Sequence, residues 1–433
     1  MKHWLRDQHF RSLLKNTSYL AVSKAIAAVA GLATLAFAGR GLGVVMFGVL
    51  IVIHSYAQAA SGLSKFQSWQ LIVRYGGDLS NDAGVARFKE ATGFAFALDA
   101  VSGLAGLLGA VALLPFLGEW FGIPAKYILF ALLYCTLLPT MGAATPVGVL
   151  RSLDRFDLIS WQETTYPIAR AVLAGIAWAT EAPFEAYLAI WYVTDLGGDL
   201  YLWFLAWREL RRRELLDGIR PTLKPRDLPA SWRFAINVNL TGSLAVAWGP
   251  IARLIVGGLL GPAAAGLYRV AATLADSAQK PADLLAKAYY PEIVRMDFAS
   301  KKPWKLMLRG TALATALGAL AVLIIVLAGR PLLTGLFGQE FIGAYPILMI
   351  LILVPMLGVI SFPLPPMLLA MDRADAPLKA RLAGTIVYFL IVVPATSRFG
   401  VSGAAGAFAV SYVAMVIVLA LQLRRQYVQV RAR

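Results

Sequence analysis

Apolar runs long enough to cross a lipid bilayer recur along the whole sequence. One of them, YLAVSKAIAAVAGLATLAFAG, covers residues 19–39, and a helix of about 20 apolar residues spans the hydrocarbon core. Only 15% of the residues are charged, whereas soluble domains contain about 25%. Backbone groups within lipid must find their hydrogen bonds inside the segment, so we expect an all-α polytopic membrane protein.

Twelve such runs can be placed along the chain. They lie near residues 17–38, 43–64, 91–115, 126–150, 159–179, 184–207, 234–259, 263–288, 306–328, 341–363, 377–396 and 402–423. We therefore expect twelve transmembrane helices, which are numbered below by their order in the sequence.

Lysine and arginine are concentrated in alternate gaps between the expected helices. Of the 40 basic residues, 31 fall in the N-terminal tail, the even-numbered gaps and the C-terminal tail. The odd-numbered gaps contain only Arg40, Lys126, Arg330 and Arg398. Cytoplasmic loops carry such an excess, so both termini are expected in the cytoplasm. The net charge of +16 is then explained by topology and by attraction to anionic phospholipids, and nucleic acid is not an expected partner.

Several classes of protein are excluded by what the sequence contains. It has no P-loop, zinc motif or nucleophile elbow, so we expect no metal site and no cofactor. The odd-numbered gaps, which face the outside when both termini are cytoplasmic, are all short. Membrane glycosyltransferases and polymerases need a sizeable loop or domain to build their active site. An enzyme is therefore not expected. A passive structural protein would not carry many charges inside the membrane, which leaves a transporter or a channel.

A glycine pattern occurs twice, 218 residues apart. The segment GRGLGVVMFG (39–48) returns as GGLLGPAAAG (257–266). The matched positions are Gly39, Leu42, Gly43 and Gly48 with Gly257, Leu260, Gly261 and Gly266. Each copy opens a group of six helices, and because six is even the two groups share one orientation. We predict two six-helix lobes, 1–207 and 234–433, related by a parallel pseudo-two-fold repeat and joined by a basic cytoplasmic linker, 208–233.

Five basic residues lie well inside the expected helices, at least six residues from either end. They are Lys24, Arg170, Arg253, Arg269 and Lys280. A cation in lipid is unfavourable, so each must reach the interface, pair with an acid or face water. The side chain of Lys24 lies close enough to the inner interface to extend to it.

The eighth expected helix carries the most informative charges. In GLYRVAATLADSAQKPADLLAKAYYPEIVR (266–295), charged residues are spaced 7, 4, 3 and 4 apart: Arg269, Asp276, Lys280, Asp283 and Lys287. This spacing places them on one helix face. The face either lines a water-filled cavity or forms ion pairs along the helix. Pro281 predicts a kink that can act as a hinge.

Acidic residues accompany these cations. The candidates for balancing the charges or for binding a coupling proton or sodium ion are Asp276, Asp283, Glu163, Asp195 and Asp199. Glu163 and Arg170 share one face of the fifth expected helix, and Asp195 and Asp199 lie in the sixth. For His54 and Asp99, an interhelical hydrogen bond is at least as good an interpretation as a functional role.

Several motifs, taken in order, resemble one known family. They are LLKNTSYL (13–20) followed by the first glycine segment, FQSWQLIVRYG (66–76), GVLRSLDRFDLI (148–159), QKPADLLAKAYYPEI (279–293) and LLAMDRADAPLKARL (368–382). Together they resemble Wzx-type lipid-linked oligosaccharide flippases. These belong to the superfamily of multidrug, oligosaccharidyl-lipid and polysaccharide exporters.

The resemblance implies a MATE-like fold in the bacterial inner membrane. It implies alternating access that moves an undecaprenyl-diphosphate-linked oligosaccharide from the cytoplasmic to the periplasmic leaflet, for O-antigen, capsule or exopolysaccharide assembly. Transport would use a proton or sodium gradient, and the polysaccharide polymerase machinery is a further candidate partner. A cavity lined by the five intramembrane cations would bind the diphosphate, because arginine forks suit phosphate oxygens.

Three alternatives stay open. A multidrug or organic cation antiporter shares the fold, although five basic residues would oppose a cationic substrate. A lipid II flippase is chemically closer, but members of that kind usually carry two additional helices. A scaffold for polysaccharide enzymes would tolerate loss of Arg253 or Arg269, whereas a flippase would not.

Overall fold

The computed structural model describes residues 8–279, 289, 293, 296, 298, 300–371, 373 and 375–432. Within these ranges the chain forms helices and turns, with no strand. It divides into two compact units, and each is described by itself. Unit 1 comprises Met1–Gly43, Ile53–Glu119 and Ile123–Val246. Unit 2 comprises Val44–Val52, Trp120–Gly122 and Ala247–Arg433.

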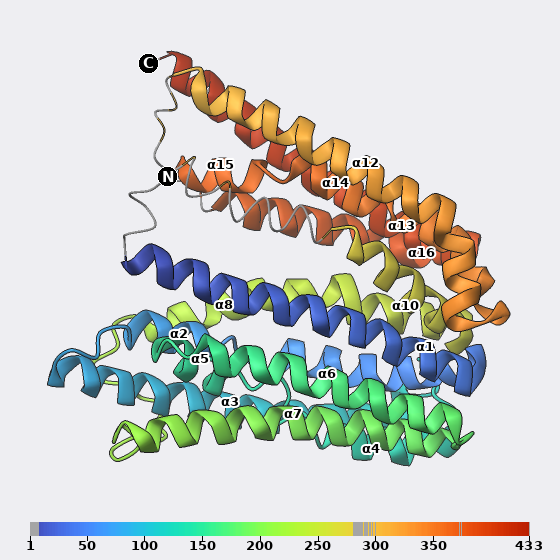
Figure 1. Ribbon diagram of the computed structural model, residues 1–433, viewed down its shortest axis with the longest axis horizontal. Coiled ribbons are helices and arrows are strands. Elements are labelled where there is room, and N and C mark those ends of the chain that lie inside the picture. Colours follow the sequence, from blue (N-terminus) through green and yellow to red (C-terminus); the bar gives the residue numbers. More distant parts are fainter. Residues whose placement is uncertain are drawn as a thin grey trace. The chain divides into compact units, whose positions relative to one another are not determined.

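Unit 1 is built around α5, α6 and α7, which lie side by side (Figure 1). Its helices are α1 (Gln8–Ser64, except residues 44–52), α2 (Trp69–Tyr75), α3 (Asp82–Leu117), a 3₁₀ turn (Ala125–Tyr127), α4 (Ile128–Cys135), α5 (Ala144–Ser152), α6 (Phe156–Ala179), α7 (Phe184–Arg212) and α8 (Ser231–Val246). Asn81 caps α3 by accepting a hydrogen bond from the backbone N–H of Gly84 at 2.8 Å. Residues 208–233, expected as a linker, belong to this unit.

In unit 2, α12 packs against α14, while α10 contacts both α9 and α13 (Figure 1). Its elements are a π-helical turn (Ala247–Ile251), α9 (Ala252–Leu260), α10 (Pro262–Ser277), α12 (Lys302–Phe337), a 3₁₀ turn (Gln339–Gly343), α13 (Ala344–Leu351), α14 (Leu353–Ser361), α15 (Leu364–Ala370) and α16 (Asp375–Ala432). Leucines on α12 remain exposed, such as Leu320 at 55% and Leu327 at 71%. An exposed apolar helix face of this kind suits contact with lipid.

Six helical stretches of the described chain are long and apolar enough to cross a membrane, judged by length and composition. Two of them contain two expected helices each. In α1, the expected helices 17–38 and 43–64 are joined at Gly43, whose backbone is non-helical. In α16, the helices expected at 377–396 and 402–423 are joined in the same way at Gly400.

Three expected helices are interrupted. The prediction of one helix over 126–150 is wrong, because α4 ends at Cys135 and α5 begins only at Ala144. The turns between them contain Pro139, whose ring lacks an N–H donor. Pro250 lies in the π-helical turn that interrupts 234–259, and a proline at this point displaces the regular hydrogen-bond ladder. The segment 341–363 is likewise divided into α13 and α14.

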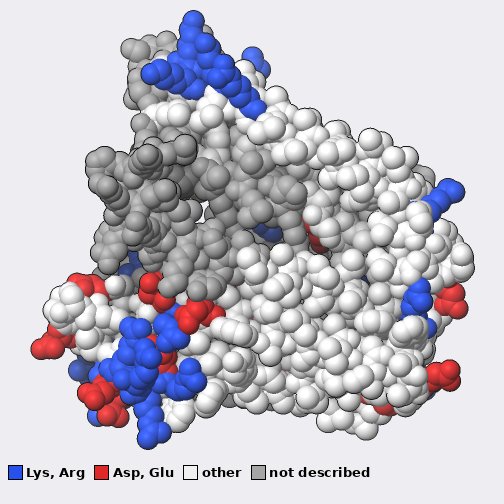
Figure 2. All heavy atoms as spheres, in the orientation of Figure 1, with Lys and Arg blue, Asp and Glu red and all other residues white. Residues whose placement is uncertain are grey.

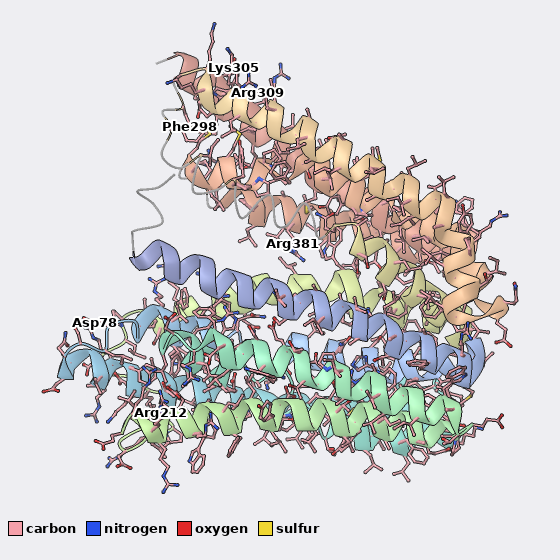
Figure 3. All side chains as sticks on the ribbon, in the orientation of Figure 1. Asp78, Arg212, Phe298, Lys305, Arg309 and Arg381 are labelled. Atoms are coloured by element: carbon pink, nitrogen blue, oxygen red, sulfur yellow. The ribbon has the colours of Figure 1, made fainter. Side chains whose placement is uncertain are left out.

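Charged side chains gather at the ends of the helices, and the surface between is white in Figure 2. In unit 1, Asp78 and Arg212 mark such a charged end (Figure 3). Lys305 and Arg309 mark the start of α12 in unit 2 (Figure 3). A broad uncharged surface with charges beyond its edges is the pattern of a membrane-embedded protein.

The two matched glycines Gly43 and Gly261 adopt the same backbone conformation. Gly43 has φ 67° and ψ 169°, and Gly261 has φ 86° and ψ 169°. A positive φ of this kind is available mainly to glycine, so the pattern marks a helix break in both copies. The second matched pair is in contact within unit 2: a Cβ on Gly266 would lie 3.2 Å from the Cα of Gly48.

We expect Gly48→Ala to lower the free energy of unfolding by about 1–3 kcal/mol, as overpacking does in other cores. The new methyl group would overlap the backbone carbonyl of Pro262, which cannot rotate away. Gly31→Ala is the matched control, because a Cβ there meets nothing within 4 Å. It should be neutral or stabilise the helix by about 0.5–1 kcal/mol. Thermal unfolding in detergent measures both, and equal shifts would contradict the close packing at Gly48.

Candidate functional site

A polar cavity of about 300 Å³ lies inside unit 1. Its polar lining comes from α1, α6 and α7: His54, Gln58, Gln162, Glu163, Tyr166, Asp195 and Asp199. The interrupted segment between α4 and α5 contributes Met141 and Gly142. Three carboxyl groups that are far apart in the sequence therefore share one cavity. Ionisable groups at this depth in apolar helices are characteristic of ion and substrate pathways.

Asp195 is the centre of the polar contacts in the cavity. One Nη of Arg170 donates a hydrogen bond to Asp195 Oδ1. The hydroxyl of Tyr134 donates to Oδ2 at 2.6 Å, and His54 Nε2 lies 3.6 Å from the same oxygen. The side chains of Arg170 and Asp195 are 11% and 15% exposed. The carboxylate thus has a cation, a hydroxyl and an imidazole around it.

Arg170 is held in place by a second contact on the neighbouring helix. Its Nε donates to Thr194 Oγ1 at 2.7 Å. The sequence suggested that Arg170 lines a cavity and binds an anion, but the structure pairs it with Asp195. A buried pair of this kind leaves an uncompensated charge if either partner is removed. Arg170 can therefore contact another anion only if the charge of Asp195 is neutralised.

The other two acids of the cavity lie on the same side of this pair, towards the start of α6 and the end of α7. Glu163 accepts a hydrogen bond from Ser23 on α1 at 3.3 Å. Asp199 lies one turn beyond Asp195 on α7. Between them α6 and α7 approach closely, because Gln162 Nε2 donates to the carbonyl of Gly198 at 3.1 Å. The charged residues that line the cavity are three carboxyl groups, and Arg170 contacts the cavity only through its pair with Asp195.

In unit 2 the sequence-predicted residues form a second charged group. Arg253 on α9 is only 6% exposed, and the charges of Arg269 and Asp276 on α10 act on it. Arg269 is half-buried and Asp276 is exposed. In unit 1, Lys24 is exposed on α1. Four other sequence-predicted positions lie outside the described residues: Lys280, Pro281, Asp283 and Lys287.

Asp99 is fully hydrogen-bonded and holds three elements together. It is 3% exposed and accepts hydrogen bonds from Ser68 Oγ at 2.8 Å and from Thr145 Oγ1 at 2.7 Å. Lys65, three residues before Ser68, donates to the backbone carbonyls of Pro139 at 3.1 Å and Met141 at 2.5 Å. These contacts fit the interhelical hydrogen-bond interpretation of Asp99.

Sequence reasoning missed several of these contacts. Tyr134, Thr194, Ser68 and Thr145 were not singled out, although each binds a charged group. Tyr134 lies in an uninterrupted apolar run, so no local signal marks it. The polar pattern SKFQS (64–68) at the end of an apolar run offered a signal for Lys65 and Ser68.

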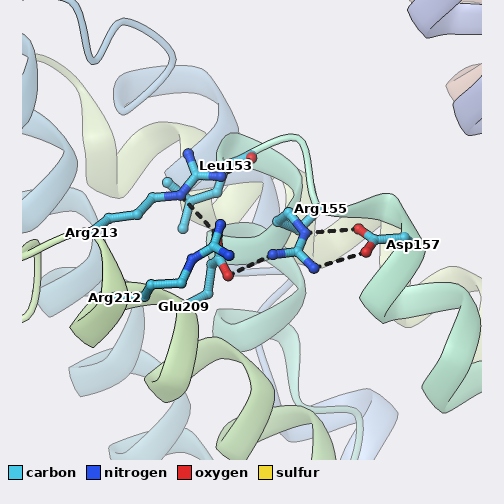
Figure 4. A network of polar contacts seen from close by, with 6 residues as sticks. All are labelled: Leu153, Arg155, Asp157, Glu209, Arg212 and Arg213. Atoms are coloured by element: carbon cyan, nitrogen blue, oxygen red, sulfur yellow. Dashed lines mark hydrogen bonds and ion pairs between the residues drawn. The ribbon is translucent and has the colours of Figure 1, made fainter.

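A second ionic network lies near the end of α7 in unit 1 (Figure 4). Glu209 on α7 is 1% exposed and accepts hydrogen bonds from Arg155 at 2.6 Å and Arg213 at 2.8 Å. Arg212 lies 3.2 Å from the same carboxylate. Arg155 also forks onto Asp157 at 2.9 and 2.8 Å. Burial opposes ionisation of Glu209, but the hydrogen bond from Arg213 and the charge of Arg155 hold its pKa below the usual value.

Comparison with known proteins gives consistent matches. The family model described as "Polysaccharide biosynthesis protein" matches residues 13–297. Inner membrane protein YghQ of Escherichia coli (strain K12) is 40% identical over 351 residues, which cover 80% of this chain and 99% of that protein.

Solved structures show the same fold at low sequence identity. An inward-facing multidrug resistance MATE family transporter of the MOP superfamily matches with a TM-score of 0.68 and 15% identity, over 96% of both chains. Lipid II flippase MurJ, in an inward closed conformation, matches with a TM-score of 0.69 and 12% identity. That match covers 95% of this chain and 89% of the MurJ chain. The all-helical fold is therefore MATE-like.

Proposed function

Because the chain belongs to the polysaccharide biosynthesis protein family, we propose that it is a flippase for a lipid-linked oligosaccharide. Its substrate would be an undecaprenyl-diphosphate-linked glycan, carried from the cytoplasmic to the periplasmic leaflet by alternating access. The chain is a transporter of the MOP type and not an enzyme. Like YghQ, it is an inner membrane protein, and the distribution of basic residues supports cytoplasmic termini.

The observation that carries this proposal is the charged cavity of unit 1. Asp195, Asp199 and Glu163 share a cavity of about 300 Å³, and Arg170 pairs with Asp195 beside it. A protein that only spanned or organised the membrane would have no reason to retain four charged residues at this depth. In a MATE-like transporter fold, such a cavity can bind a coupling cation. A proton or a sodium ion is the candidate, with Asp276 and Asp283 as further acids in the C-terminal half.

The pairing of Arg170 with Asp195 suggests how ion and substrate binding are linked. A cation that neutralises Asp195 frees the guanidinium of Arg170, which can then contact a phosphate oxygen. Arg253 and Arg269 supply positive charge in unit 2. Lys24 and Lys280 complete the set of cations proposed to bind the diphosphate, and Pro281 is proposed as the hinge of the eighth helix.

We infer in addition that twelve helices form two lobes of six. The shared backbone conformation of Gly43 and Gly261 supports a parallel repeat. So does the packing of Gly48 against Gly266, the second matched pair. On this proposal the halves are 1–207 and 234–433, joined by 208–233.

A deletion strain tests the function directly. We expect mass spectrometry to detect accumulation of a complete lipid-linked repeat unit, together with loss of the surface polysaccharide. The wild-type gene and Arg398→Gln, a change at an exposed arginine, should restore export. Arg253→Gln should fail, because it removes a buried charge of unit 2. Unchanged glycolipids combined with sensitivity to cationic compounds would instead indicate an exporter, and accumulation of lipid II would indicate a lipid II flippase.

A further inference from the structure

Two charged motifs of unit 1 return in unit 2 with two changes of charge. The first is DRFD (154–157), which returns as DRAD (372–375), 218 residues later. In both copies the arginine forks onto the second aspartate. Arg155 lies 2.9 and 2.8 Å from Asp157, and Arg373 lies 3.1 and 3.4 Å from Asp375. The spacing equals that of the glycine pattern, so the two motifs occupy equivalent positions.

The second motif lies near the end of α7 and of α16. ELRRR (209–213) returns as QLRRQ (422–426). Positions 209 and 422 are 213 residues apart, five fewer than in the first motif. The alignment instead rests on the buried Leu210 and Leu423, which are 6% and 5% exposed, and on Arg373 and Gln422 lining one cavity as Arg155 contacts Glu209. Gln422 therefore corresponds to Glu209, the buried carboxylate of the network in Figure 4.

Gln422 replaces the carboxylate of Glu209 in unit 2, and Gln426 replaces one of its three arginine partners, Arg213. In unit 1, Glu209 neutralises the arginines around it. In unit 2 a neutral amide takes its place, and a cavity of about 390 Å³ opens beside it. The polar lining of the cavity is Arg373, Lys379, Gln422, Arg425, Gln426 and Gln429. Among the described residues, Gln422 Oε1 is buried without a hydrogen-bond partner.

We propose that this cavity binds a phosphate group, which supplies the negative charge that Glu209 supplies in unit 1. Arg373, Arg425 and Lys379 line the cavity. Asp375 pairs with Arg373 at 3.1 Å and with Lys379 at 2.7 Å, so one carboxylate faces three cations and an excess of positive charge remains. Arginine forks match phosphate oxygens in pairs. The amides of Gln422 and Gln426 can donate further hydrogen bonds.

The phosphate can belong to a membrane lipid or to a soluble molecule. Val418 and Leu421 lie on the same face of α16, one turn before Gln422 and Arg425, and complete the lining. An apolar contact beside a cationic pocket suits the junction between a headgroup and an acyl chain. The basic ends of these helices are also where anionic lipids gather.

Binding can be measured on the purified full-length protein. Native mass spectrometry counts bound phosphatidylglycerol against phosphatidylcholine, and the thermal unfolding midpoint is followed with each lipid and with sodium pyrophosphate. We expect Arg373→Gln combined with Arg425→Gln to weaken phosphatidylglycerol binding at least tenfold. Arg424→Gln is the matched control, since Arg424 is exposed and does not line the cavity. It removes the same charge from the next residue and should leave binding unchanged.

A second variant, Gln422→Glu, places a carboxylate at the position that corresponds to Glu209. Gln422→Glu should abolish the binding and raise the unfolding midpoint in the absence of lipid. Stabilisation by pyrophosphate that competes with phosphatidylglycerol would assign the site to a phosphate of either source, and stabilisation by phosphatidylglycerol alone would assign it to a lipid headgroup. The proposal is overturned if the double variant binds as Arg424→Gln does, or if Gln422→Glu binds as the wild type does.

Discussion

Replacing Asp195 with asparagine is expected to reduce transport of the proposed lipid-linked substrate by about 100-fold or more. The change leaves the buried guanidinium of Arg170 without its counter-charge, and breaking such a pair costs about 3–5 kcal/mol. That cost falls on the stability of the fold, whereas the loss of transport follows from removing the carboxylate proposed to bind the coupling cation. The amide also has one acceptor oxygen in place of two, so Arg170 and the Tyr134 hydroxyl no longer each bind their own oxygen. Export is measured as the amount of surface polysaccharide and of accumulated lipid-linked precursor in the deletion strain.

The double variant Arg170→Gln with Asp195→Asn separates folding from function. Removing both charges together leaves no unpaired group, so stability should recover towards that of the wild type. Transport should not recover, because the residues proposed to link cation and phosphate binding are both gone. Normal export by Asp195→Asn at wild-type protein levels would remove this cavity from the mechanism.

Glu209→Gln is expected to lower the free energy of unfolding by about 3 kcal/mol. Glu209 is 1% exposed and binds three arginines, so its loss leaves a cluster of positive charge at the ends of α5 and α7. Thermal unfolding in detergent measures the change. Glu181→Gln, at an exposed acid of the loop before α7, is the control and should shift the midpoint little.

The same network predicts a direction for acid stability. The pKa of Glu209 and that of Asp157 are both lowered in the folded protein. For Asp157 the hydrogen bond from Arg155 is the main cause. A lowered pKa stabilises the fold above the ordinary carboxyl range, and that stability is lost as the pH falls below about 4. Glu209→Gln should flatten this part of the stability profile, and an unchanged profile would assign the acid sensitivity to other groups.

The sequence predicted the helical class and the helix boundaries near Gly43 and Gly261, because these depend on local patterns. Apolar runs dictate helices in lipid, and a repeated glycine marks the positive φ of Gly43 and Gly261. The break inside 126–150 was not predicted, because the residues around Pro139 remain apolar on both sides. A hydropathy profile does not reveal a turn whose backbone carbonyl groups accept hydrogen bonds from a side chain that is distant in the sequence. Here that donor is the ammonium of Lys65.

Candidate site residues could be predicted, but their partners could not. Arg170 and Asp195 were conspicuous because charges are rare in apolar helices. Their pairing depends on how α6 and α7 pack, since 25 residues separate them. Tyr134 gave no signal at all, because a tyrosine in an apolar run usually contributes only to packing. Glu209 was overlooked because charged residues near a helix end are normally exposed.

The lysine at the end of α1 has a mechanical consequence. An interrupted helix within a membrane leaves carbonyl groups that water cannot reach, and the ammonium of Lys65 binds those of Pro139 and Met141. Asp99 ties the start of α2 to α5 in the same region. The end of α1, α2 and the α4–α5 turn are therefore clamped into one stiff block. Any bending of unit 1 during a transport cycle would therefore occur outside this block. In α1, Gly43 is a position where it can occur, because the backbone there is already non-helical and glycine tolerates a wide range of φ.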